Sequence, residues 1–339
     1  MVRRRTFFPK RVLVRIIVAP IVILVCAVFF MFGVHTTVRA PATFTVASGD
    51  SVTGVANRLL KYNLIDSAEI FKLAVRLQGG KIQVGQYDIP RAASAWRIAD
   101  MFANGNVASV TIVVPEGLTI KQIKNLLLQS SGLTGAVECV DGNKAPVCDL
   151  HDGDVFPDTY TVARGTNRLA FLDLMRKRMA QIKDVWHKTN RKMPKPLKDW
   201  NDVITLASIV QKETPRVREM PVVASVYLNR LNKRMRLQAD PTVVYALTDG
   251  LGDMRGAALL RGHLQIDSPY NTYKHYGLPP APIANVGQAA IRAVLKPADT
   301  NYLFFVADGF GGHKFSKDYE THQKNHANWR EIKKSKVNR

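Results

Sequence analysis

One long apolar run near the N-terminus limits where the rest of this 339-residue chain can lie. Residues 16–34, IIVAPIVILVCAVFFMFGV, contain no charged side chain. As an α-helix this run would be about 28 Å long, close to the hydrocarbon thickness of a bilayer. Six cations and no acid occupy residues 1–15, whereas Arg39 is the one cation that closely follows the run. The positive-inside rule therefore predicts a basic cytoplasmic tip (1–15), a transmembrane helix (16–34) and an extracytoplasmic remainder (40–339).

The alternative for this run is a secretory signal peptide that is removed after export. The run is longer than the apolar region of a typical signal peptide. Residues 32–35, FGVH, also make a poor cleavage site, because signal peptidase prefers small side chains. We therefore expect a retained membrane anchor.

The net charge of +21, from 48 Lys and Arg against 27 Asp and Glu, does not by itself identify a partner. Such an excess suits an anionic membrane surface, an acidic polymer or nucleic acid. Because membrane topology accounts for the cations of the N-terminal tip, we do not expect a nucleic-acid partner. The charge leaves the function open.

The sequence indicates few sites built on cysteines, on histidines or on the common hydrolase and nucleotide-binding motifs. Cys139 and Cys148 flank a loop-like stretch that outside the cytoplasm would close as a disulfide, the alternative being two free thiols. His322 and His326 stand four residues apart, but Gln323 occupies the place where a zinc metalloprotease helix needs Glu. The sequence contains neither a G-x-S-x-G elbow nor a phosphate-binding G-x-x-x-x-G-K-[ST] loop. We expect no metal and no cofactor.

The pattern of elements predicts the α+β class. Residues 40–106 read as a β-α-α-β unit followed by a helix, and a domain boundary is expected near residue 106. The start of this unit resembles the LysM glycan-binding module, Y-x-V-x-x-G-D-x-L, with Phe44 for Tyr and Val52 for Leu; a generic βα packing unit is the alternative. Residues 107–339 read as alternating helices and short strands, with a hairpin at 301–316.

The chemistry is expected at the end of one buried helix. Residues 203–210 are apolar except for Thr205 and Ser208, which predicts a helix that is buried all round. Glu213 follows one turn beyond Ile209 and Val210. Burial favours the protonated form of a carboxyl group, which is what a general acid needs near neutral pH. The alternative is a helix-end residue paired with an arginine, and three nearby cations would favour the charged form: Lys212, Arg216 and Arg218.

Residues 207–214, ASIVQKET, resemble the A-S-I-[IV]-E-K-E-T signature of the MltG (YceG-like) family of endolytic murein transglycosylases. Other segments match that family in order: FPDTY (156–160), VASVYLNR (223–230), MRLQADPTVVY (235–245), SPYNTY (268–273), GLPP (277–280) and the hairpin Y-L-x-F-V-A-D…G-x-H-x-F (302–315). The resemblance covers nearly the whole chain and places anchor, LysM-like unit (40–106) and YceG-like catalytic domain (107–339) in the family's order.

The resemblance implies that Glu213 is the catalytic acid/base. It would protonate the oxygen between MurNAc and GlcNAc and then accept the proton of the MurNAc C6 hydroxyl, which attacks C1 to leave a 1,6-anhydro end. Gln211 departs from the family's first Glu and cannot give up a proton. Candidate residues for the glycan groove are Gln238, Asp240, Tyr270, Asn271, Thr272 and Tyr273, for which loop scaffolding is the alternative.

The family analogy further implies cleavage of nascent peptidoglycan glycan strands at the bacterial inner (cytoplasmic) membrane, alongside penicillin-binding synthases, so that the enzyme sets strand length. Two alternatives remain open on the sequence. One is a hydrolytic muramidase that uses the same acid, and the other is a non-catalytic peptidoglycan-binding scaffold.

Overall fold

The computed structural model describes residues 20–23, 38–140, 142, 145–189, 192–251, 254 and 257–337. The expected basic tip (1–15) lies outside these residues, as does the expected membrane run (16–34) except for residues 20–23. Within the described part, no helix is both long enough and apolar enough to cross a bilayer.

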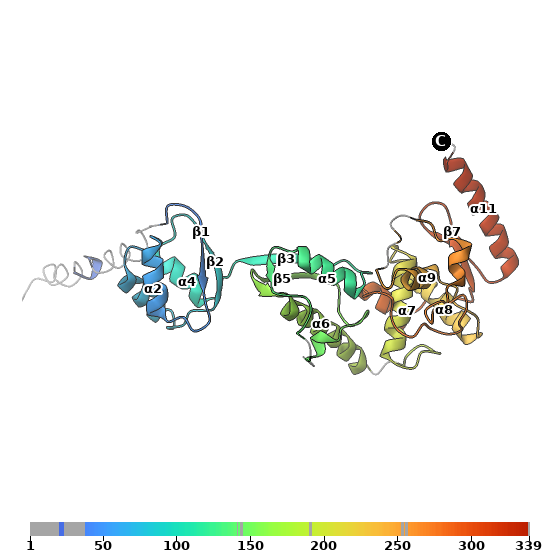
Figure 1. The fold of residues 1–339 in the computed structure, drawn as a ribbon, viewed down its shortest axis with the longest axis horizontal. Helices are drawn as coiled ribbons and strands as arrows, with labels where there is room; N and C mark the ends of the chain where they lie inside the picture. The colour runs from blue at the N-terminus through green and yellow to red at the C-terminus, as the bar shows by residue number, and fades with distance from the viewer. Residues whose placement is uncertain are drawn as a thin grey trace, which may run out of the picture. The chain divides into compact units, whose positions relative to one another are not determined.

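The chain divides into two compact units, which are drawn in Figure 1. The N-terminal unit comprises Met1–Val110 with Thr161–Gly165, and the C-terminal unit comprises Thr111–Tyr160 with Thr166–Arg339. Described strands form two-stranded sheets and the remaining regular structure is helical, so the expected mixed α+β class is confirmed.

The N-terminal unit has the element order that the sequence predicts. β1 (Ala42–Val46) pairs antiparallel with β2 (Gly85–Ile89), and Ala42 lies opposite Ile89. The helices α2 (Val52–Lys61) and α3 (Ala68–Leu77) lie between these strands in sequence, and α4 (Ala95–Ala103) follows them. The likeness of this β-α-α-β unit to a LysM module stays a prediction.

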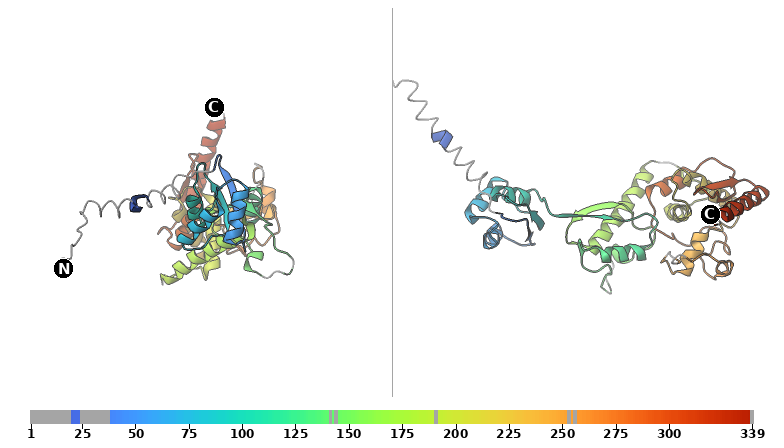
Figure 2. Two further views of the ribbon diagram at one scale, coloured as in Figure 1. Left: turned by 90° about the vertical axis from the view of Figure 1, so that its left-hand side faces the viewer. Right: turned by 90° about the horizontal axis from the view of Figure 1, so that it is seen from above.

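Alternating side chains of the two strands form the core of this unit. Phe44 and Val46 of β1 and Tyr87 of β2 are buried, in keeping with the two-residue period of a strand. The ring of Phe102 on α4 lies 4.4 Å from that of Tyr87 and 5.7 Å from that of Phe44. The helices therefore cover the apolar face of the two-stranded β1–β2 sheet, which Figure 2 draws from two further sides.

The C-terminal unit is mainly helical. Its helices are α5 (Ile120–Gln129), α6 (Arg168–Lys188), α7 (Trp200–Glu213), α8 (Met220–Asn232), α9 (Asp240–Leu247), α10 (Gln288–Leu295) and α11 (Tyr319–Val337), with short 3-10 turns η2 (Pro146–Cys148) and η3 (Arg261–Gln265). Its short strands are β4 (Leu133–Thr134), β6 (Thr166–Asn167), β7 (Phe304–Ala307) and β8 (His313–Ser316). β4 pairs parallel with β6, and β7 pairs antiparallel with β8 to form the predicted hairpin.

Two further strands, β3 (Ser109–Val113) and β5 (Thr159–Ala163), pair with each other, and the division between the units falls within both. The disulfide between Cys139 and Cys148, expected from the sequence, is present, with Cα atoms 5.5 Å apart.

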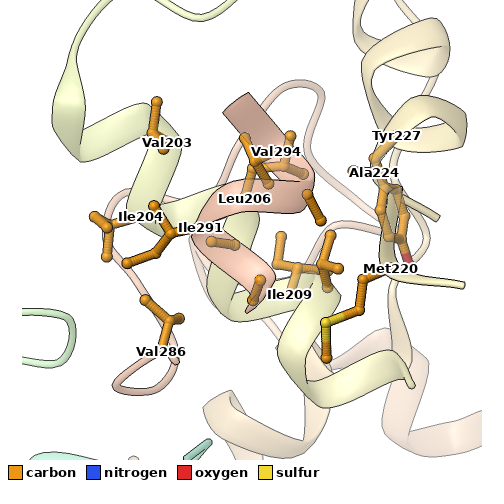
Figure 3. Packing of buried hydrophobic residues seen from close by; sticks show 14 of the residues in the cluster. Val203, Ile204, Leu206, Ile209, Met220, Ala224, Tyr227, Val286, Ile291 and Val294 are labelled. Atoms are coloured by element: carbon orange, nitrogen blue, oxygen red, sulfur yellow. The ribbon is translucent and has the colours of Figure 1, made fainter. Parts of the chain in front are cut away.

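The core of the C-terminal unit is built around α7. Every residue of α7 from Val203 to Val210 is buried, as its apolar pattern predicts. Figure 3 shows Leu206 of α7 beside Val294 of α10, and Tyr227 on the neighbouring helix α8. The buried hydroxyl of Ser208 donates to the carbonyl of Thr205 at 2.7 Å and accepts from the N–H of Ile283 at 3.0 Å. This polar residue is therefore tolerated in an apolar helix because its hydrogen bonds are satisfied.

Candidate active site

The end of α7 places Glu213 at the edge of the core. The helix begins after Asp199, whose side chain accepts a hydrogen bond from the N–H of Asp202 at 2.9 Å. It ends at Glu213 because Thr214 is extended and precedes Pro215, and a residue before proline disfavours helical geometry. The Glu213 side chain is therefore partly buried, one turn beyond a fully buried helical segment.

Tyr227 of α8 fixes one carboxylate oxygen of Glu213. Its hydroxyl donates to Oε1 of Glu213 at 2.7 Å. The tyrosine is only 1% exposed, and its ring packs edge-on against Phe305 of β7 at 5.8 Å. Because the core holds the phenol in place, its hydroxyl orients the carboxyl group as well as providing a hydrogen-bond partner for Oε1.

Burial raises the pKa of Glu213 from 4.5 to about 7, and desolvation is the largest cause. The hydrogen bond from Tyr227 and the positive charge of Arg230 lower this pKa, whereas the negative charge of Asp240 raises it. The net result is a carboxyl group that is protonated in about half of the molecules near neutral pH.

The sequence suggested that Lys212, Arg216 and Arg218 would lower the Glu213 pKa, but these are not the cations that lower it. Arg216 lies 3.5 Å from Glu219 and also donates to the carbonyl of Phe310, and Lys212 donates to the carbonyl of Gly117 at 3.3 Å. Arg218 is exposed. The lowering charge comes instead from Arg230 on the next helix.

Glu213 faces a pocket of about 300 Å³. Its lining residues are Lys212, Glu213, Asp240, Pro241, Val244, Tyr245 and Ile283. Asp240, at the start of α9, accepts a hydrogen bond from the Tyr273 hydroxyl at 2.5 Å. Desolvation raises the pKa of Tyr273, and the negative charges of Asp240 and Glu213 add to this effect. The structure therefore brings together three of the predicted residues: Glu213, Asp240 and Tyr273.

The other predicted groove residues have different environments. Asn271 and Thr272 are 0% and 2% exposed. The Asn271 amide donates to the carbonyls of Leu264 and Ile266, and the Thr272 hydroxyl accepts from the N–H of Ala239 at 2.9 Å. This is the arrangement of the loop-scaffolding alternative, because their polar atoms are used inside the protein.

Gln238 and Tyr270 lie closer to the surface. Gln238 is exposed with a left-handed backbone, φ 48°, and its N–H donates to the carbonyl of Thr272 at 3.1 Å. Tyr270 is half-buried, and its ring lies 4.9 Å from that of Tyr245. Tyr270 therefore reaches the Glu213 pocket only through Tyr245, which lines it.

Gln211 makes a structural hydrogen bond and has no part in proton transfer. Its Oε1 accepts from the N–H of Gly287 at 3.2 Å, immediately before α10. Gly287 provides no capping side chain, so the glutamine satisfies a backbone donor at the start of that helix. Gln211 thus links α7 to α10.

Sequence reasoning assigned no role to Tyr227 or Arg230. Arg230 is 7% exposed, and it donates to the carbonyls of Leu303 at 2.7 Å and Leu237 at 2.6 Å. The available signal was a tyrosine and an arginine three residues apart in the mainly apolar segment VASVYLNR, since such residues are rarely buried without partners.

The histidines of α11 pack with aromatic rings. His322 stacks on Phe304 with ring centroids 5.2 Å apart, and the His326 ring lies 5.5 Å from that of Trp329. In the part of the chain that the structure describes, no three His, Cys, Asp or Glu residues are grouped so that they could hold a metal ion.

Comparison with known proteins gives consistent matches. An "Endolytic murein transglycosylase" of Bacillus subtilis (strain 168) is 29% identical over 317 residues, with 84% of each chain covered. A protein of the same name from Streptococcus pneumoniae (strain ATCC BAA-255 / R6) is 25% identical, and the match covers 84% of this chain and 57% of that protein. The crystal structure of a YceG-like protein from Listeria monocytogenes aligns with a TM-score of 0.49 at 29% identity, covering 84% of this chain and 98% of that one.

A family model extends these pairwise matches along the sequence. The model of the YceG-like family matches residues 44–328, a stretch that includes α7 and every residue of the Glu213 pocket. With so much of its length matched, the chain belongs to the YceG-like family.

Proposed function

We propose that this protein is a membrane-anchored endolytic transglycosylase, which cleaves the MurNAc–GlcNAc bond of nascent murein strands and leaves a 1,6-anhydro-MurNAc end. The observation that carries the proposal is the Glu213 carboxyl group, which faces a pocket and has a pKa raised to about 7 by burial. The names of the Bacillus and Streptococcus relatives support the same activity.

Glu213 acts first as an acid. Tyr227 donates to Oε1, so the transferable proton is carried by Oε2. This proton passes to the bridging oxygen as the bond from C1 of MurNAc to that oxygen breaks. A pKa near the working pH lets one residue give up a proton and later regain it.

The same group then acts as a base. The C6 hydroxyl oxygen of the MurNAc bonds to C1, and its proton passes to the Glu213 carboxylate. The protonated acid is restored and no water is consumed. An attacking group within the same sugar replaces the second carboxylate of an ordinary glycosidase, because it is already held close to C1.

The competing reaction is hydrolysis, and Asp240 is the residue that favours it. It is a second carboxylate in the same pocket, and glycosidases that use water generally need two carboxyl groups. Asp240 would then activate water, and the product would be a reducing end. In the transglycosylase, its negative charge keeps Glu213 protonated and stabilises the positive charge that develops at C1.

Mass spectrometry of murein digested by the purified protein separates these reactions, because an anhydro end is lighter than a reducing end by one water. We expect anhydro ends from the wild type and none from Glu213→Gln. The matched control is Glu331→Gln on the exposed face of α11. Reducing ends alone would refute the transglycosylase mechanism, and full cleavage by Glu213→Gln would leave a different residue, or no residue, as the acid.

The proposal includes an anchor at residues 16–34 that holds residues 40–339 outside the cytoplasm, next to the synthases that extrude new strands. The disulfide between Cys139 and Cys148 supports this location, since such bonds persist in oxidising compartments. An alkaline phosphatase fused after residue 60 should be active, and a fusion that shows this segment in the cytoplasm would refute the topology.

A further inference from the structure

A second pocket adjoins the Glu213 pocket. Its volume is about 630 Å³. Tyr245 lines both pockets, and one segment supplies a further wall to each, through Ile283 in the first pocket and Ala281 and Pro282 in the second. The two pockets therefore share a wall, and a molecule bound at Glu213 lies next to the second pocket.

Two lysines of α5, Lys121 and Lys124, line this pocket together with the acids that pair with them. The Lys121 ammonium lies 2.6 Å from Asp249, and the Lys124 ammonium lies 2.8 Å from Glu138. The two acidic side chains are 97% and 69% exposed, whereas that of Lys124 is 19% exposed. The pair of Lys121 with Asp249 is exposed on both sides, and such a pair contributes at most about 1 kcal/mol, so the carboxylate of a ligand can replace Asp249 at little cost.

The remaining walls carry both apolar and polar side chains, among them the exposed leucines Leu128 and Leu251 and the polar residues Asn125 and His151. Leu128 and Leu251 are 52% and 47% exposed at this pocket. The Tyr245 hydroxyl donates to the buried carboxylate of Asp152 at 2.7 Å, and the ring of Tyr245 lies against that of Tyr270. The two ammonium groups and the exposed leucines suit a ligand that carries carboxylates and small apolar side chains.

We infer that the pocket of Lys121 and Lys124 binds the stem peptide of the MurNAc residue whose glycosidic bond lies at Glu213. The inference rests on the proposed function. The peptide is attached through the lactyl group at C3 of the same sugar ring whose C1 reacts. A peptide on a sugar at Glu213 must therefore leave that pocket into an adjacent space, and its carboxylates then meet the two ammonium groups.

The test compares two substrates: glycan strands with stem peptides, and the same strands after an amidase has removed the peptides. The measured quantity is the ratio of kcat/KM for the two substrates. We expect Lys124→Met to lower this ratio about tenfold, and Lys121→Met to lower it less because that lysine is more exposed. The matched control, Lys324→Met on α11, removes an exposed paired lysine and should leave the ratio at its wild-type value.

A ratio that is unchanged in both pocket variants, with kcat/KM values still measurable, would overturn the inference. Equal losses on both substrates, in variants whose thermal unfolding matches the wild type, would also overturn it and would assign the pocket to the neighbouring sugar. Failure of the proposed function has a separate signature, since Glu213→Gln would then cleave both substrates at the wild-type rate.

Discussion

The replacement of Glu213 by Gln should stabilise the protein at alkaline pH while abolishing catalysis. Glutamine keeps the shape of the side chain and can still accept the hydrogen bond of Tyr227, but it cannot ionise. The rise of the Glu213 pKa from 4.5 to about 7 means that the folded state holds a proton that the unfolded state releases. At 1.36 kcal/mol for each factor of ten, this difference amounts to about 3 kcal/mol.

The sign of the effect follows from proton linkage. Below pH 4.5 the group is neutral in both states, and it does not affect stability. Between pH 4.5 and about 7 the unfolded state ionises first, so stability falls as the pH rises. Above about pH 7 the folded protein contains a desolvated carboxylate, and the full cost of about 3 kcal/mol is present.

Urea unfolding of wild type and Glu213→Gln at pH 4 and pH 8, followed by tryptophan fluorescence, measures this cost. Trp200 at the start of α7 packs against the core of the C-terminal unit and reports on it. The difference between the two proteins should be close to zero at pH 4 and about 3 kcal/mol in favour of Gln at pH 8. Other titrating groups cancel in this comparison. A difference that is the same at both pH values would refute the claim that Glu213 is held as a desolvated acid.

Four further results are expected. Wild-type kcat/KM should fall as the pH rises through about 7, because the acid form of Glu213 is required. Tyr227→Phe removes a hydrogen bond that lowers the Glu213 pKa, so this limb of the pH–rate profile should move to higher pH, and the plateau should fall about tenfold. The control Tyr160→Phe removes another buried hydroxyl and should leave the profile unchanged. Gln211→Glu adds a like charge two residues from Glu213 and should also move that limb to higher pH, and an unmoved limb would contradict this. Cys139→Ser should lower the free energy of unfolding by about 2–3 kcal/mol, measured against the wild type under oxidising conditions, with no difference expected once the wild type is reduced.

Local patterns in the sequence were sufficient to predict the elements that carry the site. The uninterrupted apolar segment of α7 has no polar face, and the structure buries it entirely. The alternation of buried residues likewise predicted the short strand β1, and the glycine-rich turn predicted the β7–β8 hairpin. These features depend on neighbours in the chain, which the sequence displays directly.

The partners of Glu213 could not be predicted in this way, because they come from distant parts of the chain. Tyr227 lies 14 residues further on, and the contact of Tyr273 with Asp240 spans 33 residues. From the sequence alone, Asn271 and Tyr273 cannot be distinguished, because both are polar residues of one loop. Burial separates them, since Asn271 bonds only within its loop region whereas Tyr273 bonds to a residue of the Glu213 pocket.

The limits of the compact units also depend on residues that are distant in the sequence. The boundary that the sequence places near residue 106 stays a prediction; the compact units divide after Val110, and Thr161–Gly165 belongs to the N-terminal unit. Arg164 explains this assignment, because its N–H donates to the carbonyl of Ala108 at 2.7 Å and its guanidinium lies 3.2 Å from Asp88. The pairing of β3 with β5, about 50 residues away, leaves no local signal near residue 106.

The acidity of Glu213 is set by three helices together. Burial of Glu213 at the end of α7 raises its pKa, α8 supplies Tyr227 and Arg230, which lower it, and α9 supplies Asp240, which raises it again. Each of these contributions depends on the distance between helices rather than on the residue itself. The signature on α7 therefore identifies Glu213 as the acid, but the pKa of Glu213 near 7 follows from the packing of all three helices. A change that separates α8 from α7 would alter catalysis while leaving every residue of that signature in place.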